Sequence, residues 1–175
     1  MTETSVPAGT GDEARTLEVS WSDPRAAAMR AFEMSREELL KSIVSGDLPN
    51  PPIGQLLNFK VTEAEPGRAV IEFVPDERHE NLIGVVAGGV AGTVLDAAMW
   101  IAVQASLEDK SVVSTVSMSM NFMRRLSREA GNVRAVARTL HVGRSTATAE
   151  AWLEDGSGRR YAQATASFLR MGGGQ

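Results

Sequence analysis

The sequence predicts an α+β domain in which an antiparallel β-sheet wraps around one long central α-helix. An apolar segment at about 88–106 has no broad polar face, so the helix that it forms must be covered on nearly every side. Strand-like segments lie on both sides of it in the sequence, two before and four after. A sheet is the element available to cover the helix.

The strands are separated by turn signals. Two strands are expected at 59–65 and 68–74, because Pro66-Gly67 between them favours a hairpin. After a loop, Gly88-Gly89 opens the helix. Short glycine-containing turns separate the later strands, which favours antiparallel pairing of neighbours. These later strands are expected at 112–124, 132–142, 145–154 and 160–170.

Two of the later strands carry small residues on one face. Alanine recurs there at every second position, which places the side chains on the same side of a strand. Small side chains allow a bulky element to come close, so this face is expected to lie against the helix. The positions are Ala147, Ala149 and Ala151 in one strand, and Ala162, Ala164 and Ala166 in the next.

The chain is expected to have three parts: a disordered tail at 1–21, a helical arm at 22–52 and one domain at 53–171. The tail mixes Thr, Glu, Gly, Ser and Pro without any period. The arm is too short to form a core of its own, so it is expected to pack on the domain.

Capping residues predict two helices in the arm. Asp23 followed by Pro24 is typical of a helix start, and a helix is expected over 26–34. Ser35 and Glu38 form a capping box for a second helix, which is expected to end at Gly46. The prolines that follow predict a stiff connector; they are Pro49, Pro51 and Pro52.

Composition excludes several classes of protein. The 175 residues are 43% hydrophobic and 23% charged, which is typical of a soluble globular chain. A net charge of -4 gives no overall basic field for nucleic acid or a membrane surface. The absence of cysteine excludes disulfides and thiol catalysis and fits a reducing cytoplasm. No signal peptide is apparent, and the apolar helix contains Asp96 and Gln104, so it is expected to be buried and not to span a membrane.

Basic residues gather in one part of this acidic chain. Six arginines lie between 124 and 144 against a single acid, Glu129. Such a strip suits a small anionic ligand better than a polymer, although any one arginine could equally be a solvated surface residue. The six are Arg124, Arg125, Arg128, Arg134, Arg138 and Arg144.

Several chemistries lack the residues that they need. His79 and His141 are the only histidines, and their separation fits no metal site. No Gly-x-Ser-x-Gly motif supplies a serine nucleophile. The glycines at 88–92 match neither a phosphate-binding loop nor a dinucleotide fingerprint. We therefore expect no metal and no nucleotide cofactor.

The start of the long helix is a candidate site. Gly88 and Gly89 leave unpaired amide groups at the positive end of the helix, where they could stabilise a developing oxyanion. The alternative is that these glycines only allow close packing of helix and sheet.

Asp96 is a stronger candidate for a functional residue than the two glycines, because it is a charged residue in the middle of the apolar helix. A buried carboxylate must be hydrogen-bonded, paired or next to a wet cavity, so Asp96 is either a functional group or a structural aspartate. It lies eight residues after Gly88, or about 12 Å along the helix. If both groups act on one substrate carbonyl, the carboxylate must come from a second copy of the chain, as in a two-fold dimer with antiparallel helices.

The segment around these residues resembles a known family. The pattern Asn-x-x-Gly-x-x-His-Gly-Gly followed by a mid-helix Asp is similar to that of hotdog-fold thioesterases of the phenylacetate-degradation type, a group like the 4-hydroxybenzoyl-CoA thioesterases. The resemblance runs from about Pro52 to Met171, and it implies the hotdog fold. The matching residues are Asn81, Gly84, Gly88, Gly89 and Asp96.

The resemblance implies roles for these residues. Asp96 would be the nucleophile or general base, and Asn81 would position water or substrate. The Gly88 amide would bind the thioester oxygen, with Gly89 beside it at the substrate. The family commonly has a Ser or Thr early in the strand after the helix; here Thr115 is favoured over Ser114, and ordinary strand propensity is the alternative for both.

The family also implies a site for coenzyme A. A Gly-Arg pair near a late strand often lies close to the coenzyme; here it is Gly143-Arg144, followed by Ser145. Arg124 and Arg125 are further candidates for its phosphates. One departure stands out: the family's histidine is Ala87 in this chain, which puts the rate in doubt. His79 and Glu80 lie nearby in sequence, without any sign that either replaces it.

The resemblance implies hydrolysis of acyl-CoA or arylacyl-CoA thioesters by a homodimer or a tetramer (a dimer of dimers). Coenzyme A would enter only as part of the substrate. A second hypothesis, suggested by Ala87, is a protein that binds acyl-CoA or an aryl acid without turnover. A hydratase or dehydratase is disfavoured, because the histidine motif of those families is not found.

Overall fold

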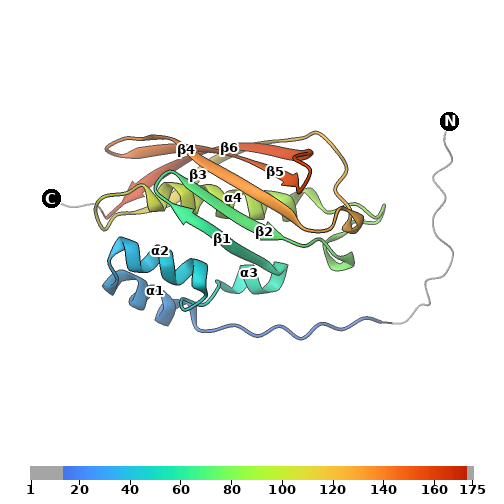
Figure 1. The fold of residues 1–175 in the computed structure, drawn as a ribbon, viewed down its shortest axis with the longest axis horizontal. Helices are drawn as coiled ribbons and strands as arrows, with labels where there is room; N and C mark the ends of the chain where they lie inside the picture. Colours follow the sequence, from blue (N-terminus) through green and yellow to red (C-terminus); the bar gives the residue numbers. More distant parts are fainter. Residues whose placement is uncertain (1–13, 173–175) are drawn as a thin grey trace.

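Six antiparallel strands form one sheet around helix α4 (Gly88–Ala105) in this computed structural model, which describes residues 14–172 (Figure 1). The order across the sheet is β1-β2-β4-β5-β6-β3. Every strand contacts α4, which confirms the predicted arrangement of a sheet wrapped around one central helix. The strands are β1 (Phe59–Glu65), β2 (Arg68–Phe73), β3 (Val112–Phe122), β4 (Val133–Val142), β5 (Thr146–Asp155) and β6 (Arg160–Met171).

Strand pairing differs in one respect from what neighbouring turns suggest. Strands β4, β5 and β6 pair in chain order, but β3 pairs with β6 and not with β4, which follows it in the chain. The loop after β3, which includes a 3₁₀ turn at Arg128–Ala130, carries the chain across to β4. Strand β3 therefore forms one edge of the sheet.

The alanine faces of β5 and β6 lie in the core, as predicted. Each of the six alanines is at most 5% exposed. Small side chains let the two strands approach α4, whose inner side is fully buried. The buried α4 residues include Val94, Leu95, Ala98, Met99 and Ala102.

One side of α4 is not covered, contrary to the expectation of a helix enclosed on nearly every side. We call it the open face of α4. Because β3 lies at the edge of the sheet, no strand among residues 14–172 extends over this side. The open face consists of the exposed Gly89 and Trp100 and the half-buried Thr93, Asp96, Ala97 and Gln104.

Helix α4 is long and apolar enough to cross a membrane by length and composition alone. However, 56% of it is buried inside the domain, as in the core helix of a soluble protein.

The arm has the two predicted helices, α1 (Pro24–Glu33) and α2 (Arg36–Ser45), with the expected caps at Asp23, Ser35 and Gly46. Helix α2 packs on β1 through Ile43 and Val44. The predicted tail falls mostly on residues 1–13, outside the described residues; residues 14–21 have no regular secondary structure.

The predicted connector was partly wrong, because Pro52 starts a third helix, α3 (Pro52–Leu57). A proline at the first helical position has a suitable φ and lacks only an amide that would be unpaired anyway. The Asn50 side chain secures this helix by donating from Nδ2 to the Phe59 carbonyl at 2.6 Å.

Candidate active site

Asp96 and Thr115 meet beside the open face of α4. The Thr115 hydroxyl donates to Asp96 Oδ1 at 2.9 Å. In the single chain Asp96 is half-buried, not fully buried as its apolar neighbours suggested, because it lies on the side of α4 that the sheet leaves uncovered. The carboxylate is thus both hydrogen-bonded and accessible, as a reacting group must be.

The two hydroxyl candidates of β3 lie on opposite faces of the strand. Thr115 is paired with the buried Phe168 and points toward α4. Ser114 is exposed and has no recorded side-chain hydrogen bond among residues 14–172. A β-bulge directly after Thr115 leaves Val116 without a partner in the ladder. The geometry therefore brings Thr115 to Asp96 and leaves Ser114 on the other side.

Two further residues of α4 hold β3 in place, and sequence analysis missed them. Trp100 Nε1 donates to the Val113 carbonyl at 2.7 Å. The Gln104 side chain donates to the Ser111 carbonyl at 2.9 Å and accepts from the Val113 amide at 3.2 Å. Both follow Asp96 at helical spacing, four and eight residues on, so the spacing of polar groups along α4 was the available signal.

The N-terminus of α4 has free amide groups. Ala87 is its N-cap and provides no side-chain cap. Among the described residues, the amides of Gly88 and Gly89 donate to no recorded acceptor, as is usual for the first turn of a helix. A Cβ on Gly88 would lie 2.8 Å from Phe122 Cζ, whereas one on Gly89 would meet nothing within 4 Å. Packing against Phe122 therefore favours glycine at 88, and within residues 14–172 the Gly88 amide is free in addition.

Asn81 stabilises the loop that leads into α4. Its Oδ1 accepts from the amides of Ile83 at 3.0 Å and Val85 at 3.3 Å. The loop turns at Gly84, which has a φ of 70° that favours glycine. Within one chain the Asn81 carboxamide has no recorded contact with Asp96.

Neither His79 nor Glu80 takes the place of the histidine that Ala87 lacks. His79 is 2% exposed and packs edge-on against Phe73, with ring centroids 5.0 Å apart. Its Nδ1 accepts from the Asp76 amide at 3.0 Å, and desolvation by burial lowers the pKa of the imidazole. Glu80 faces Arg128 at 3.7 Å. His79 is thus a core residue of the loop.

The arginines of 124–144 do not form one basic strip, which corrects that expectation. Arg134 pairs with Glu154 at 3.3 Å, and Arg138 pairs with Glu150. These pairs cross neighbouring strands, β4 and β5, so acids that are distant in the sequence neutralise the arginines. Arg128 faces Glu77 at 3.5 Å as well as Glu80. Arg124 donates to the Arg160 carbonyl at 2.6 Å.

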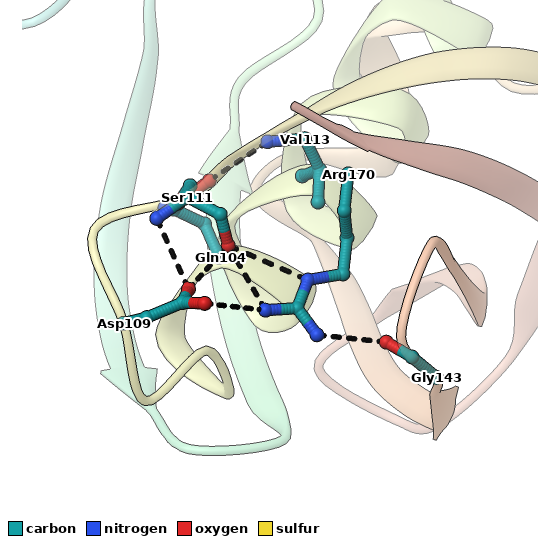
Figure 2. Close-up of polar contacts among 6 residues, drawn as sticks. All are labelled: Gln104, Asp109, Ser111, Val113, Gly143 and Arg170. Atoms are coloured by element: carbon teal, nitrogen blue, oxygen red, sulfur yellow. Dashed lines mark hydrogen bonds and ion pairs between the residues drawn. The ribbon is translucent and has the colours of Figure 1, made fainter. Parts of the chain in front are cut away.

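Arg125 and Arg144 differ from these, since within residues 14–172 neither side chain has an ion pair or a hydrogen bond. Arg144 lies in the turn between β4 and β5 with Gly143 and Ser145. The Gly143 carbonyl accepts from Arg170 Nη1 at 2.7 Å, and the same guanidinium binds Asp109 in the loop after α4 (Figure 2). This turn therefore lies near the C-terminal end of α4, whereas Gly88 is at its N-terminal end.

A single chain thus presents three separate groups: the Asp96–Thr115 pair, the amides at the start of α4, and the turn at 143–145. Two hollows among the described residues lie away from these groups. One of about 190 Å³ is on the outside of the sheet, between Arg138, Trp152 and Arg160. No cluster of three His, Asp or Glu side chains within residues 14–172 could hold a metal ion.

Comparison with known proteins identifies the domain. The model of the family "Thioesterase superfamily" matches residues 83–162, which include α4, β3, β4 and β5. This part of the hotdog domain resembles the thioesterase superfamily. The expectations of a hotdog fold and of a thioesterase are therefore confirmed. The match begins just after Asn81.

Individual relatives agree with this family. The chain is 27% identical over 101 residues to a 1,4-dihydroxy-2-naphthoyl-CoA hydrolase of Listeria monocytogenes, which covers 58% of this chain and 80% of the relative. Among solved structures, a phenylacetic acid degradation-related protein of Ralstonia eutropha is 26% identical, with a TM-score of 0.67 over 74% of this chain and 98% of that one. The phenylacetic acid degradation protein PaaI of Thermus thermophilus is also 26% identical, with a TM-score of 0.63 over 69% of this chain and 100% of that one.

Proposed function

We propose that this protein hydrolyses acyl-CoA thioesters to the free acid and coenzyme A, with Asp96 as nucleophile or general base. The observation that carries the proposal is the Thr115–Asp96 hydrogen bond at an uncovered face of a domain that resembles the thioesterase superfamily. Coenzyme A enters as part of the substrate, so the reaction needs no separate cofactor. We place the activity in the cytoplasm, in keeping with a chain that has no cysteine.

In the proposed reaction, Asp96 takes a proton from water while the water oxygen attacks the thioester carbon, or Asp96 attacks that carbon itself. Asn81 would position the water or the substrate. The carbonyl oxygen becomes an oxyanion and accepts from the Gly88 amide, which the positive end of α4 makes a favourable donor. Collapse of this intermediate breaks the carbon–sulfur bond and releases the thiolate of coenzyme A. When water is the nucleophile, this step gives the free acid directly. When Asp96 is the nucleophile, it leaves an acyl–Asp96 anhydride, which water then hydrolyses to the free acid and the Asp96 carboxylate.

The proposed site requires two chains. Asp96 and Gly88 of one helix are about 12 Å apart along its axis, which is too far for both to act on one carbonyl. In an antiparallel pair of helices, Gly88 meets the partner's Asp96 when the two-fold axis passes near Gly92, the residue midway between them. Such a dimer contains two identical sites.

The position of β3 supports the same axis. Phe122 lies beside Gly88, and Thr115 lies beside Asp96. Met118 and Met120, between these two residues of β3, lie against Gly92. A two-fold axis near Gly92 would therefore also pass near the middle of β3, and the two β3 edges could pair.

The edge of β3 favours such pairing. Charged residues and prolines usually prevent association at exposed strand edges. The 11 residues of β3 include neither. Val116 is 67% exposed and Phe122 is 56% exposed, and apolar side chains at an open edge usually mark an interface. We propose a homodimer built through β3 and the open face of α4, alone or within a tetramer.

Arg144 is the preferred contact for the phosphates of coenzyme A, because its guanidinium has no ion pair among the described residues. Gly143 and Ser145 would provide the turn that presents it. Arg125 is a second candidate for the same reason, whereas Arg124 is already engaged with the Arg160 carbonyl. Gly89 and Ser114 are weaker candidates, with open surroundings and no recorded contact.

The alternative is a protein that binds acyl-CoA without turnover. It is motivated by Ala87, which leaves the start of α4 without a side-chain cap or an imidazole. Hydrolysis is favoured because a binding protein has no need for a carboxylate held at 2.9 Å by a threonine on an accessible helix face.

The experiment is steady-state hydrolysis of a panel of acyl-CoA and arylacyl-CoA esters, measured by thiol release. Asp96→Asn should lower kcat by about a hundredfold or more while the fold and oligomer size are retained. Glu108→Gln is a matched control, because it also replaces a carboxylate with an amide. Glu108 is exposed and lies two residues after Ser106, the C-cap of α4. Near-wild-type activity of a folded Asp96→Asn protein would refute the mechanism.

Mixed dimers test the shared site. Asp96→Asn and Asn81→Ala should each be inactive as pure proteins. Random exchange should restore about a quarter of wild-type activity, because half of the dimers are hybrids and each hybrid has one intact site. No recovery after verified exchange would mean that both residues act within one chain.

A further inference from the structure

Arg170, near the end of β6, joins three separate segments of the chain (Figure 2). Its Nη1 donates to the Gly143 carbonyl at 2.7 Å, in the turn between β4 and β5. Its Nη2 donates to Asp109 Oδ2 at 2.9 Å, in the loop after α4. Nη2 and Nε both reach the Ser111 hydroxyl, at 3.1 Å and 3.4 Å. A guanidinium is suited to this position because its planar fork offers five donors in fixed directions.

The loop side of this cluster is rigidly built. Ser111 is fully buried, and its hydroxyl donates to Asp109 Oδ1, which also accepts from the Ser111 amide at 3.0 Å. These hydrogen bonds from Ser111, together with the positive charge of Arg170, lower the pKa of Asp109. The carboxylate therefore stays ionised opposite the guanidinium.

The cluster continues to β3. The Ser111 carbonyl accepts from the Gln104 side chain at 2.9 Å, and Gln104 also accepts from the Val113 amide at 3.2 Å. Thr115, which binds Asp96, lies two residues further along the strand. One continuous set of hydrogen bonds thus runs from the turn at 143–145 to the strand that holds the catalytic candidate.

The turn itself is held on both sides of Arg144. On one side the Gly143 carbonyl accepts from the Arg170 side chain. On the other the Ser145 carbonyl accepts from the Arg170 amide at 2.9 Å. Arg144 lies between these two attachments and has no ion pair of its own among residues 14–172. Both attachments are made by Arg170, whose side chain is only 18% exposed.

We propose that Arg170 is a positioning residue for the nucleotide part of the substrate: it fixes the turn at 143–145 so that Arg144 can bind the phosphates of coenzyme A. The inference rests on the proposed function, since it deepens the binding half of that site. Asp109 and Ser111 serve in turn to orient Arg170. Binding of the nucleotide would therefore depend on the loop after α4, which contains Asp109 and Ser111, as well as on the turn at 143–145.

The test compares two substrates that differ only in the nucleotide. One is the best acyl-CoA ester of the panel; the other carries the same acyl group on pantetheine, which lacks the nucleotide and all of its phosphates. Arg170→Lys keeps the charge opposite Asp109 but cannot serve Gly143, Asp109 and Ser111 together. It should raise KM for the acyl-CoA about tenfold, with kcat little changed and with kcat/KM for the short ester unaltered.

Arg144→Ala should have the same selective effect, and the double variant should be no worse than the poorer single variant, because Arg170 acts through Arg144. Gly143→Ala provides an independent variant. Its Cβ would lie 3.1 Å from both the Thr146 carbonyl and His141 Nε2, so the backbone of the turn at Thr146 and the His141 side chain must each give by a few tenths of an ångström while Arg170 is retained. Lys110→Met is the control for loss of one nearby positive charge, since Lys110 donates to the Phe32 carbonyl and lies outside the guanidinium cluster.

Three results would overturn the inference: an equal loss with both substrates, additive effects in the double variant, or an unchanged KM in Arg170→Lys and Gly143→Ala. If Arg170→Lys does not fold, Gly143→Ala decides by the same criterion. Failure of the proposed function has a different signature, namely a wild-type protein that turns over neither the acyl-CoA nor the short ester.

Discussion

Replacing Thr115 with valine removes one hydrogen bond to Asp96 and little else, because the two side chains have nearly the same shape. The bond is 2.9 Å long and ends on a carboxylate. Hydrogen bonds to charged groups contribute about 1.5–3 kcal/mol when they are shielded from solvent. Asp96 and Thr115 are each only half-buried, so water can replace part of the lost bond.

We therefore take the lower end of that range, about 1.5 kcal/mol, as the loss of orientation at Asp96. If this loss falls on the transition state, kcat should drop about tenfold. Thr115→Ser keeps the hydroxyl and should retain most of the activity. In an Asp96→Asn background, Thr115→Val should have no further effect, because the hydroxyl acts through the carboxylate.

The assay is kcat by thiol release, alongside thermal unfolding of each variant. Thr165→Val is the matched control: it makes the same change at an exposed position of β6. An unchanged kcat in Thr115→Val would refute the reasoning. A larger loss in Ser114→Ala than in Thr115→Val would also refute it and would transfer the role to the other face of β3.

Two further predictions concern Ala87 and Asp155. Ala87→His should raise kcat/KM about tenfold if an imidazole at the start of α4 only helps to orient the reacting groups; a fall would mean that the ring does not fit. Asp155 accepts from the hydroxyls of Ser157 and Tyr161, which lowers its pKa to about 2. Its contribution to stability should therefore be present above about pH 4 and lost as the pH falls toward 2. Thermal unfolding of wild type and Asp155→Asn should differ at pH 5 and converge at pH 2; a constant difference would contradict this.

Local signals in the sequence predicted the elements well. The capping box at Ser35 and Glu38, the left-handed Gly46 and the alternating alanines each act within a few residues, so their consequences could be read directly. Helix α3 was missed because prolines both end and start helices, and the sequence does not say which.

Contacts between distant segments could not be predicted in the same way. The arginines of β4 looked unopposed because their acids, Glu150 and Glu154, lie on the next strand. The sequence favoured Thr115 over Ser114 as the hydroxyl of the site, but it did not show that Thr115 binds Asp96, since a bulge sets which of the two residues faces α4. Arg170 gave no signal, because its partners come from two loops that only the folded sheet brings together.

The bulge after Thr115 makes β3 intolerant of a change in length. Before it, the odd-numbered positions Val113 and Thr115 face the helix; after it, the even-numbered Met118, Met120 and Phe122 do. The extra residue, Val116, is what switches the alternation. If one residue were deleted here, only one half of the strand could keep its orientation. Either Thr115 would stay hydrogen-bonded to Asp96, or Met118, Met120 and Phe122 would stay packed against Gly88 and Gly92 of α4. We therefore expect active variants of this protein to tolerate substitutions in β3 but not the insertion or deletion of a residue.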